Sequence, residues 1–134
     1  MTSSSSPSGY IVVISAVISA IIAGAIASTV LSLAVTANDT SMVIQKSAKA
    51  KALADACAET ALWELSEDVN YAGNTILPIG GDSCEILPVL GDGNEDRTIQ
   101  VIGTADDVVR KIEIDIAEVS PAMTIRSWQE VGGF

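Results

Sequence analysis

The sequence predicts an α+β fold, in which a long N-terminal helix packs on a small antiparallel β-sheet head. Three observations lead to this prediction. Residues 1–38 contain no Asp, Glu, Lys or Arg, whereas all seventeen acidic and all seven basic residues follow them. Residues 41–68 contain neither Gly nor Pro, and they are rich in good helix formers. Beyond residue 73, short apolar segments alternate with Gly-, Pro- and Asn-containing turns, a pattern typical of strands.

These composition changes divide the chain into four regions. Residues 1–9 are small and polar, and we expect a flexible leader or tail there. Residues 10–38 are predicted to form a hydrophobic helix that lies in a membrane or in the core of an assembly. Residues 39–72 are predicted to form the amphipathic half of the same helix, and residues 73–134 the β-rich head.

The apolar part of the predicted helix is long enough to cross a bilayer. Residues 10–37 would extend about 42 Å, against a hydrocarbon core of about 30 Å. A secretory signal peptide is the alternative, but it would need a basic start and a shorter apolar core. No Lys or Arg precedes Tyr10. We therefore expect a retained helix.

Small side chains recur every four residues along this segment. They form two neighbouring rows, Ala16, Ala20, Gly24 and Ser28 in one, and Ser15, Ser19, Ala23 and Ala27 in the other. Such rows let the backbones of membrane helices approach one another closely. The alternative is that these residue types are simply common in membrane helices. We interpret the rows as a packing face.

The second half of the predicted helix is apolar on one side. The apolar residues at helical spacing are Ala54, Ala58, Ala61, Leu62, Leu65 and Val69. Lys49, Ala56 and Trp63 fall elsewhere on the helix surface. One helix over about residues 10–68 is therefore expected, followed by a turn region over residues 69–81 that is rich in Gly, Asn and Pro.

Four strands are predicted after this turn. They cover residues 83–89, 97–103, 108–119 and 123–131, and in the third Ile112, Ile114 and Ile116 alternate with acidic residues. Such alternation indicates a sheet that is covered on one face. The short connections favour an antiparallel meander, and the apolar side of residues 54–69 is the expected cover.

Composition excludes several classes of function. The net charge of −10 lies entirely after residue 38, and an acidic head repels nucleic acid. The absence of His removes the commonest general base and a common metal ligand. No catalytic set and no Gly-rich phosphate loop are present. We expect a protein that is not an enzyme and that uses no cofactor.

One loop resembles a cation-binding loop in part. Residues 91–96 carry oxygen-bearing side chains at alternate positions, as calcium loops do. The loop lacks the central Gly, because Arg97 stands there, and it lacks the distant Glu. A plain hairpin loop is the preferred interpretation.

The two cysteines, Cys57 and Cys84, lie in the predicted helix and at the start of the first predicted strand. A bridge between them would tie the sheet to the helix and add about 3 kcal/mol of stability. The alternatives are two buried thiols in a reducing compartment and a metal site, although two Cys without His fall short of four ligands. Trp63 and Trp128 are expected to pack in the core, with contacts between subunits as the alternative.

The segment SPSG-YIVVISAVISA resembles the start of type IV pilins and pseudopilins, particularly of the minor pilins. In that family a peptidase cuts after a Gly that precedes the apolar helix, here Gly9, which is followed by Tyr10 where the family usually has Phe. ACAETALWELSEDVNYAGN and SWQEV also look like minor pilins. The resemblance implies a helix that continues out of the membrane and a β-sheet packed on its C-terminal half.

Two features depart from the family. The family usually has Glu five residues into the mature helix, where it neutralises the terminal amine of a neighbouring subunit, and this chain has Ile14. Some minor pseudopilins that sit at filament tips also lack this Glu. The family leader is usually basic, and residues 1–9 are not.

The resemblance implies a structural subunit that polymerises with other pilin-like subunits through helix bundling. Membrane lipid would surround the helix before assembly, and the head would lie outside the cell. Lys46, Lys49 and Lys51 follow the span, so the positive-inside rule points the other way. A non-polymerising, membrane-anchored adhesin or binding module is the alternative function.

Overall fold

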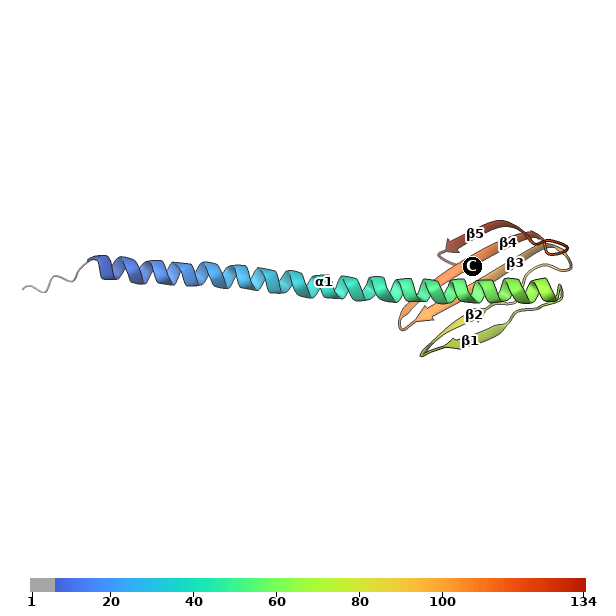
Figure 1. The fold of residues 1–134 in the computed structure, drawn as a ribbon, viewed down its shortest axis with the longest axis horizontal. Coiled ribbons are helices and arrows are strands. Elements are labelled where there is room, and N and C mark those ends of the chain that lie inside the picture. Colours follow the sequence, from blue (N-terminus) through green and yellow to red (C-terminus); the bar gives the residue numbers. More distant parts are fainter. Residues whose placement is uncertain (1–6) are drawn as a thin grey trace, which may run out of the picture. The chain divides into compact units, whose positions relative to one another are not determined.

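A computed structural model describes residues 7–134 of the chain. It contains one helix and five strands (Figure 1), which are α1 (Pro7–Glu67), β1 (Thr75–Ile79), β2 (Asp82–Ile86), β3 (Glu95–Ala105), β4 (Val108–Glu118) and β5 (Thr124–Val131). The chain folds into two compact units, of which one ends at Met42 and the other covers Val43–Phe134. The predicted α+β fold is confirmed.

Helix α1 begins earlier than expected. Residues 1–6 of the predicted leader lie outside the described residues, but residues 7–9 are helical, so the expected tail over 1–9 is wrong at its end. Proline suits the first turn of a helix because its missing N–H needs no partner there. The segment 38–40 is helical, and α1 ends at Glu67, one residue before the predicted end.

The sheet is an antiparallel meander in the order β1-β2-β3-β4-β5, which confirms the predicted topology. It has five strands where the sequence predicts four, because β1 lies inside the segment that was expected to be turn. Strand β1 pairs with β2 from Thr75–Ile86 to Ile79–Asp82. It contains Pro78, which an edge strand tolerates because one side of its backbone needs no ladder partner.

The C-terminal part of α1 lies across one face of the sheet (Figure 1) and forms the core with it. The predicted apolar side of the helix is confirmed, since Ala54, Ala58, Ala61 and Leu65 are fully buried and Leu62 and Val69 are partly buried. In β4 the predicted alternation holds, because Ile112, Ile114 and Ile116 are buried while the intervening acidic residues are not.

Gly103 sets how closely α1 approaches β3. A Cβ atom at this position would overlap the carbonyl oxygen of Ala50 and would come within 2.9 Å of Ala54 Cβ. The helix backbone therefore rests directly on the strand, and the small side chains of Ala50 and Ala54 complete this contact. Any side chain at 103 would push the helix away from the sheet.

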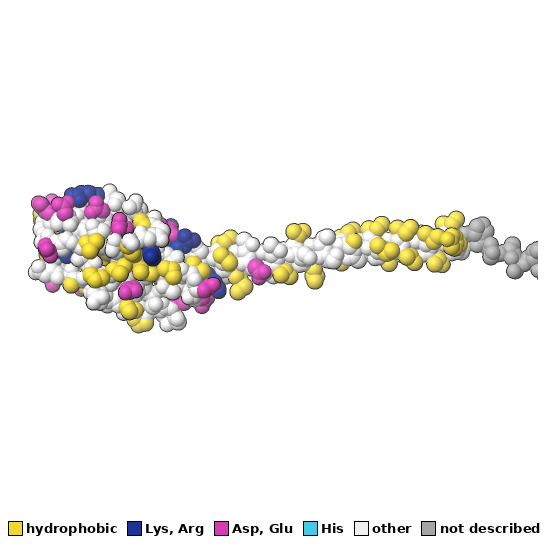
Figure 2. All heavy atoms as spheres, turned by 180° about the vertical axis from the view of Figure 1, so that it is seen from behind, with side chains coloured by type: hydrophobic (Ala, Val, Ile, Leu, Met, Phe, Trp, Pro, Cys, Tyr) yellow, Lys and Arg dark blue, Asp and Glu magenta, His cyan; other side chains and the backbone are white. Residues whose placement is uncertain are grey.

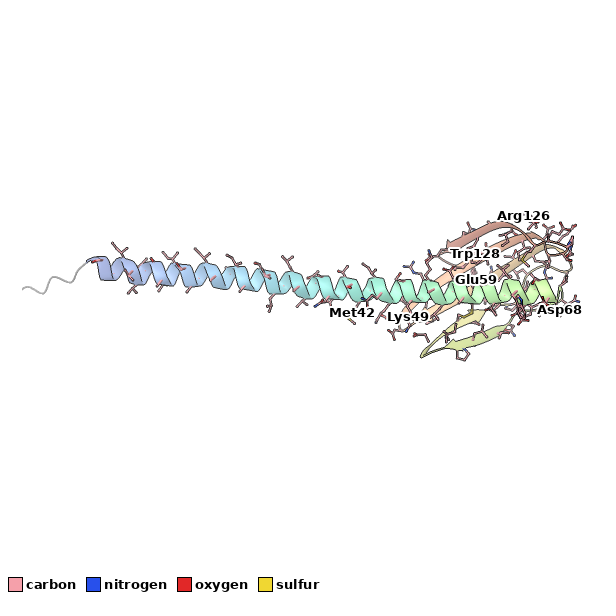
Figure 3. All side chains as sticks on the ribbon, viewed as in Figure 1. Met42, Lys49, Glu59, Asp68, Arg126 and Trp128 are labelled. Carbon is pink, nitrogen blue, oxygen red and sulfur yellow. A yellow bond between two sulfur atoms is a disulfide. The ribbon has the colours of Figure 1, made fainter. Side chains whose placement is uncertain are left out.

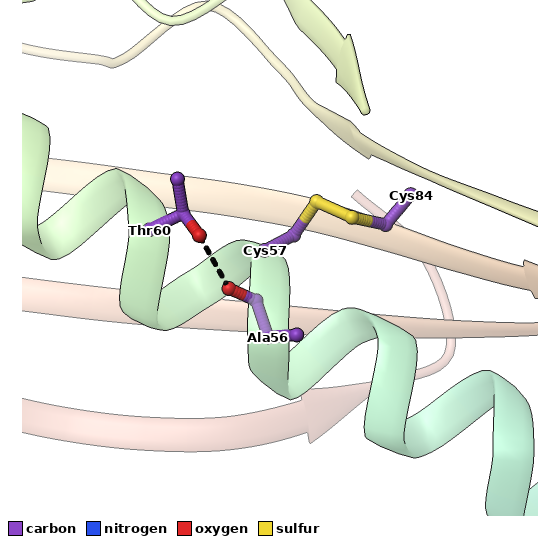
Figure 4. The surroundings of a disulfide bond; sticks show 4 residues. All are labelled: Ala56, Cys57, Thr60 and Cys84. Atoms are coloured by element: carbon purple, nitrogen blue, oxygen red, sulfur yellow. Dashed lines mark hydrogen bonds between the residues drawn. A yellow bond between two sulfur atoms is a disulfide. The ribbon is translucent and has the colours of Figure 1, made fainter. Parts of the chain in front are cut away.

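A disulfide joins Cys57 of α1 to Cys84 of β2 (Figure 4), with the two Cα atoms 6.1 Å apart. Both residues are buried, at 0% and 1% exposure. The strand register brings the two cysteines together. Cys84 is the cross-strand partner of Gly103, and Gly103 is where the sheet approaches the helix backbone most closely. The bridge therefore ties the sheet to α1 as expected.

Candidate functional site

The candidate functional site is the surface of α1 in the unit that ends at Met42. Every side chain from Ser8 to Met42 is exposed, including Tyr10 at 72% and Leu31 at 71%. By length and composition α1 is a candidate membrane span, with a mean hydropathy of 2.5 in its most apolar window. Figure 3 shows its side chains projecting on both sides of the ribbon. A continuous apolar surface of this kind requires lipid or protein around it.

The small residues of this unit lie on one broad face of α1. Residues four apart are neighbours on a helix, and each step turns about 40° around the axis. The rows that begin at Ser15 and Ala16 therefore curve around the helix together. The opposite side of the same stretch carries large apolar side chains, all exposed, namely Ile14, Ile18, Ile21 and Ile22.

Gly24 has no structural reason to be glycine within the described chain. A Cβ atom there would have nothing within 4 Å, and the helix backbone is regular. A helix-interior Gly costs about 1 kcal/mol relative to Ala. The space at Gly24 is thus available to a neighbouring helix.

Hydroxyl groups extend the row that begins at Ala16. Ser32 donates to the Ser28 carbonyl at 2.9 Å, Thr36 to the Ser32 carbonyl at 3.0 Å, and Thr40 to the Thr36 carbonyl at 2.9 Å. These donors are satisfied inside the helix, which lowers the cost of placing them in an apolar environment. The rows predicted from the sequence stop at Ser28, and the spacing of four that continues through Ser32, Thr36 and Thr40 was the missed signal.

The predicted cleavage position lies in the first turns of α1. Gly9 and Tyr10 are both helical and exposed, and a Cβ at Gly9 would meet nothing within 4 Å. The bond between them is therefore on the surface of this unit. Cleavage after Gly9 stays a prediction.

The lysines that follow the apolar segment are paired within the head unit. Lys46 Nζ lies 3.0 Å from Asp107 Oδ1 and 3.8 Å from Asp106 Oδ2, and Lys49 pairs with Asp82. The hydrogen bond from Lys49 is the main cause that lowers the pKa of Asp82, and that from Lys46 lowers the pKa of Asp107. The pKa values of both lysines are raised by the same contacts. Both lysines are therefore part of the ion pairs that join α1 to the turns of the sheet.

The loop at residues 91–96 is organised by Arg97. This side chain is 4% exposed, and its guanidinium donates to the carbonyls of Val69 at 2.6 Å, Gly93 at 3.0 Å and Leu90 at 3.2 Å. The Asn94 side-chain oxygen accepts a hydrogen bond from the Ser120 N–H, and Asp96 forms an ion pair with Arg126. Among the described residues, no cluster of three or more His, Cys, Asp or Glu side chains is arranged to hold a metal ion.

The two tryptophans are not core residues, so that prediction is wrong. Trp63 is 61% exposed and Trp128 is 41% exposed. Trp63 points away from the sheet because it lies opposite Ala61 and Leu65 on α1, about half a turn away. Trp128 of β5 is the cross-strand partner of Ile114 and therefore lies on the helix-facing side of the sheet. Strand β5 is at the edge of the sheet, however, where the helix does not cover the side chain.

No family model matches this chain, and no curated protein or solved structure matches it at a significant level. The candidate function therefore rests on the geometry of α1 and of the head unit.

Proposed function

We propose that this chain is a non-catalytic, membrane-anchored structural subunit that assembles with other pilin-like subunits into a filament of the type IV pilus kind. The observation that carries the proposal is the exposed helical surface of residues 10–37, which has no charged side chain and carries its two rows of small residues on one face. In lipid, large apolar side chains alone suffice for solvation. The small face adds close contact between helices.

Close approach is the physical basis of the proposed assembly. Helices in lipid gain little from the hydrophobic effect when they associate, so van der Waals packing dominates. Rows of residues at i and i+4 on both helices favour right-handed crossings of about −40°. The open space at Gly24 and the internally bonded hydroxyls of Ser32 and Thr36 fit this mode.

The head supports the proposal in a second way. Its disulfide is compatible with an exterior location, where such bonds persist. Its acidic surface, part of which appears in Figure 2, keeps it soluble when it is outside the membrane. The head would lie on the outside of the filament, with α1 of each subunit toward the core.

A single-pass anchor that displays the head without polymerising is the second candidate. The exposed Trp63 and Trp128 favour it, because exposed tryptophans are common at binding surfaces. The two functions differ in whether copies of α1 contact one another.

The experiment compares substitutions on the two faces of α1 in the full chain. Gly24→Leu and Ala20→Leu fill the small face, and we expect each to reduce filament number in electron micrographs and cross-linking between copies. Ile21→Leu on the opposite face is the matched control and should leave both unchanged. Head folding is checked by retention of the Cys57–Cys84 bond.

Normal filaments from the Leu variants would contradict the small face as the packing surface. An Ala20→Cys chain that never cross-links to a second copy, with no filaments formed by the unmodified chain, would favour the anchor. Native protein that begins at Tyr10 in N-terminal sequencing would support the predicted cleavage after Gly9.

A further inference from the structure

The head unit has a groove between the start of its part of α1, near Val43, and the adjacent ends of β4 and β5. Its helix side is lined by Val43, Ile44, Ser47, Ala48 and Lys51, and its sheet side by Val108, Arg110 and Glu130. The groove has a volume of about 460 Å³. Val43 and Ile44 are 60% and 62% exposed, so the apolar wall is open to a partner.

Three polar residues of this groove, Arg110, Glu130 and Ser47, are paired with one another. Arg110 Nη1 lies 2.7 Å from Glu130 Oε1, and Arg110 Nε donates to Ser47 Oγ at 3.1 Å. Lys51 is exposed, and its long stem lets the ammonium stay in water. A cationic occupant would meet no unpaired carboxylate in the lining, because Glu130 is held by Arg110. The Lys51 ammonium lies in water, away from the apolar wall that Val43, Ile44, Ala48 and Val108 form. The lining therefore matches an uncharged apolar occupant.

This chain itself contains such an occupant. Residues 10–37 have no charged side chain, form part of α1, and are exposed throughout. Their large apolar face lies opposite the small face that the proposed function assigns to contacts between N-terminal helices. Once this segment leaves lipid, that large face needs a protein cover of its own.

We propose that the groove receives the large apolar face of residues 10–37 from a second copy of the chain. The groove wall covers residues 43–51 of α1, about 12 Å or two turns at the helical rise. Two turns of the incoming helix would place Ile18 and Ile22 against Ile44, Ala48 and Val108. This inference rests on the proposed function and assigns the contact between the head of one subunit and the helix of the next.

The test is cysteine cross-linking between two differently tagged full-length chains. One chain carries Ala48→Cys and the other Ile22→Cys, and both keep the buried Cys57–Cys84 bond. We expect a cross-linked heterodimer after mild oxidation. The control pairs Ile22→Cys with Ile76→Cys, because Ile76 is 65% exposed on β1, the far edge of the sheet, and its cross-linking should be at least 10-fold weaker.

A second variant probes the groove chemically. Ile44→Asp introduces a charge into the wall and should lower the yield of the 48–22 heterodimer at least 10-fold, whereas Ile76→Asp should leave it unchanged. Equal cross-linking from positions 48 and 76, or an unchanged yield with Ile44→Asp, would overturn the groove assignment.

The outcome also separates this inference from the proposed function. Cross-linking through Ala20→Cys between copies, without the 48–22 product, would reject the groove and keep helix bundling. Loss of both products would reject the two together.

Discussion

Gly103 and Arg97 show how single residues fix the head at the residue scale. Both belong to β3 and both face α1, but they act differently. Gly103 contributes by having no side chain, which lets the helix backbone touch the strand. Arg97 contributes a buried guanidinium whose donors serve backbone carbonyls from two separate connections.

Gly103→Ala is expected to destabilise the full chain by about 1–3 kcal/mol, as overpacked cores do. The added Cβ meets backbone atoms, which cannot move aside as a flexible side chain can. Denaturant unfolding in detergent micelles, followed by near-UV circular dichroism, measures the change. Gly81→Ala is the control, since a Cβ there meets nothing within 4 Å. An effect of the same size at both positions would contradict the close-approach explanation.

Arg97→Met should cost about 2 kcal/mol of unfolding free energy, because a buried guanidinium and its hydrogen bonds to the carbonyls of Val69, Gly93 and Leu90 are lost at once. The substitution keeps most of the side-chain length while it removes the hydrogen bonds. Arg126→Met removes a surface guanidinium that pairs with Asp96, and exposed pairs contribute only about 0–1 kcal/mol. Similar unfolding midpoints for the two variants would show that the Arg97 network is not stabilising.

At the scale of elements, α1 is attached to the sheet by three kinds of contact. Apolar packing joins its Ala-rich side to β3 and β4, the disulfide joins it to β2, and ion pairs join it to two turns. Lys49 reaches Asp82 at the start of β2, and Lys46 reaches Asp106 and Asp107 between β3 and β4. The ion pairs are the contacts that pH can change.

The ion pairs predict a defined dependence of stability on pH. The pKa values of Asp82 and Asp107 are lowered from the ordinary 3.8, so their stabilisation is present above that value and is lost as pH falls through the lowered pKa. The pKa values of Lys46 and Lys49 are raised from 10.5, so their contribution is present below 10.5 and is lost as pH rises through the raised pKa.

The measurement compares unfolding midpoints of the unmodified chain with those of Lys46→Met/Lys49→Met across pH. We expect a constant difference on the plateau between these limits and a vanishing difference at both extremes. Taking the difference removes the titration of the other carboxylates. A difference that persists well below the lowered pKa values would mean that the lysines stabilise the head in some other way.

At the scale of the whole molecule, the unit that ends at Met42 has surface chemistry quite unlike that of the head. The head buries an apolar core and carries most of the charge, whereas α1 before residue 43 has only Asp39 as a charged residue and exposes its apolar side chains. Such a chain is soluble in water only if the apolar helix is covered. Lipid and a helix bundle are the two covers that the proposed function combines.

Membrane insertion is therefore expected to fail when charges are placed in the apolar segment. Ile18→Lys/Ile22→Lys adds two lysines, each costing about 2.5–3.5 kcal/mol at the centre of a spanning helix. The variant should move from the membrane fraction, which resists an alkaline wash, to the soluble or aggregated fraction. Ile18→Leu/Ile22→Leu is the control and should stay in the membrane. Equal membrane retention of both variants would argue against α1 as the anchor.

Local sequence patterns predicted much of the fold and part of the candidate site. The helix and its apolar side follow from a periodicity of 3.6 residues, and the strands of the meander follow from a periodicity of 2. Both periodicities depend only on neighbours along the chain. The four-residue rows from Ser15 to Ser28 were found for the same reason. The extension of one row through Ser32, Thr36 and Thr40 was missed, because hydroxyl side chains are recognised as part of an apolar helix surface only when their donors are seen to bond inside the helix.

The sequence by itself determined that an uncharged helix is joined to a charged α+β head, because composition and periodicity are properties of short stretches. Only the tertiary structure decided that Thr75–Ile79 is a strand, that Trp63 and Trp128 are exposed, and that the Arg97 guanidinium donates to the Gly93 carbonyl in the 91–96 loop. Each of these depends on which distant segment lies alongside, such as Val69 beside Arg97 or β2 beside β1. A partner brought close by folding leaves no periodic signal in the residues around it.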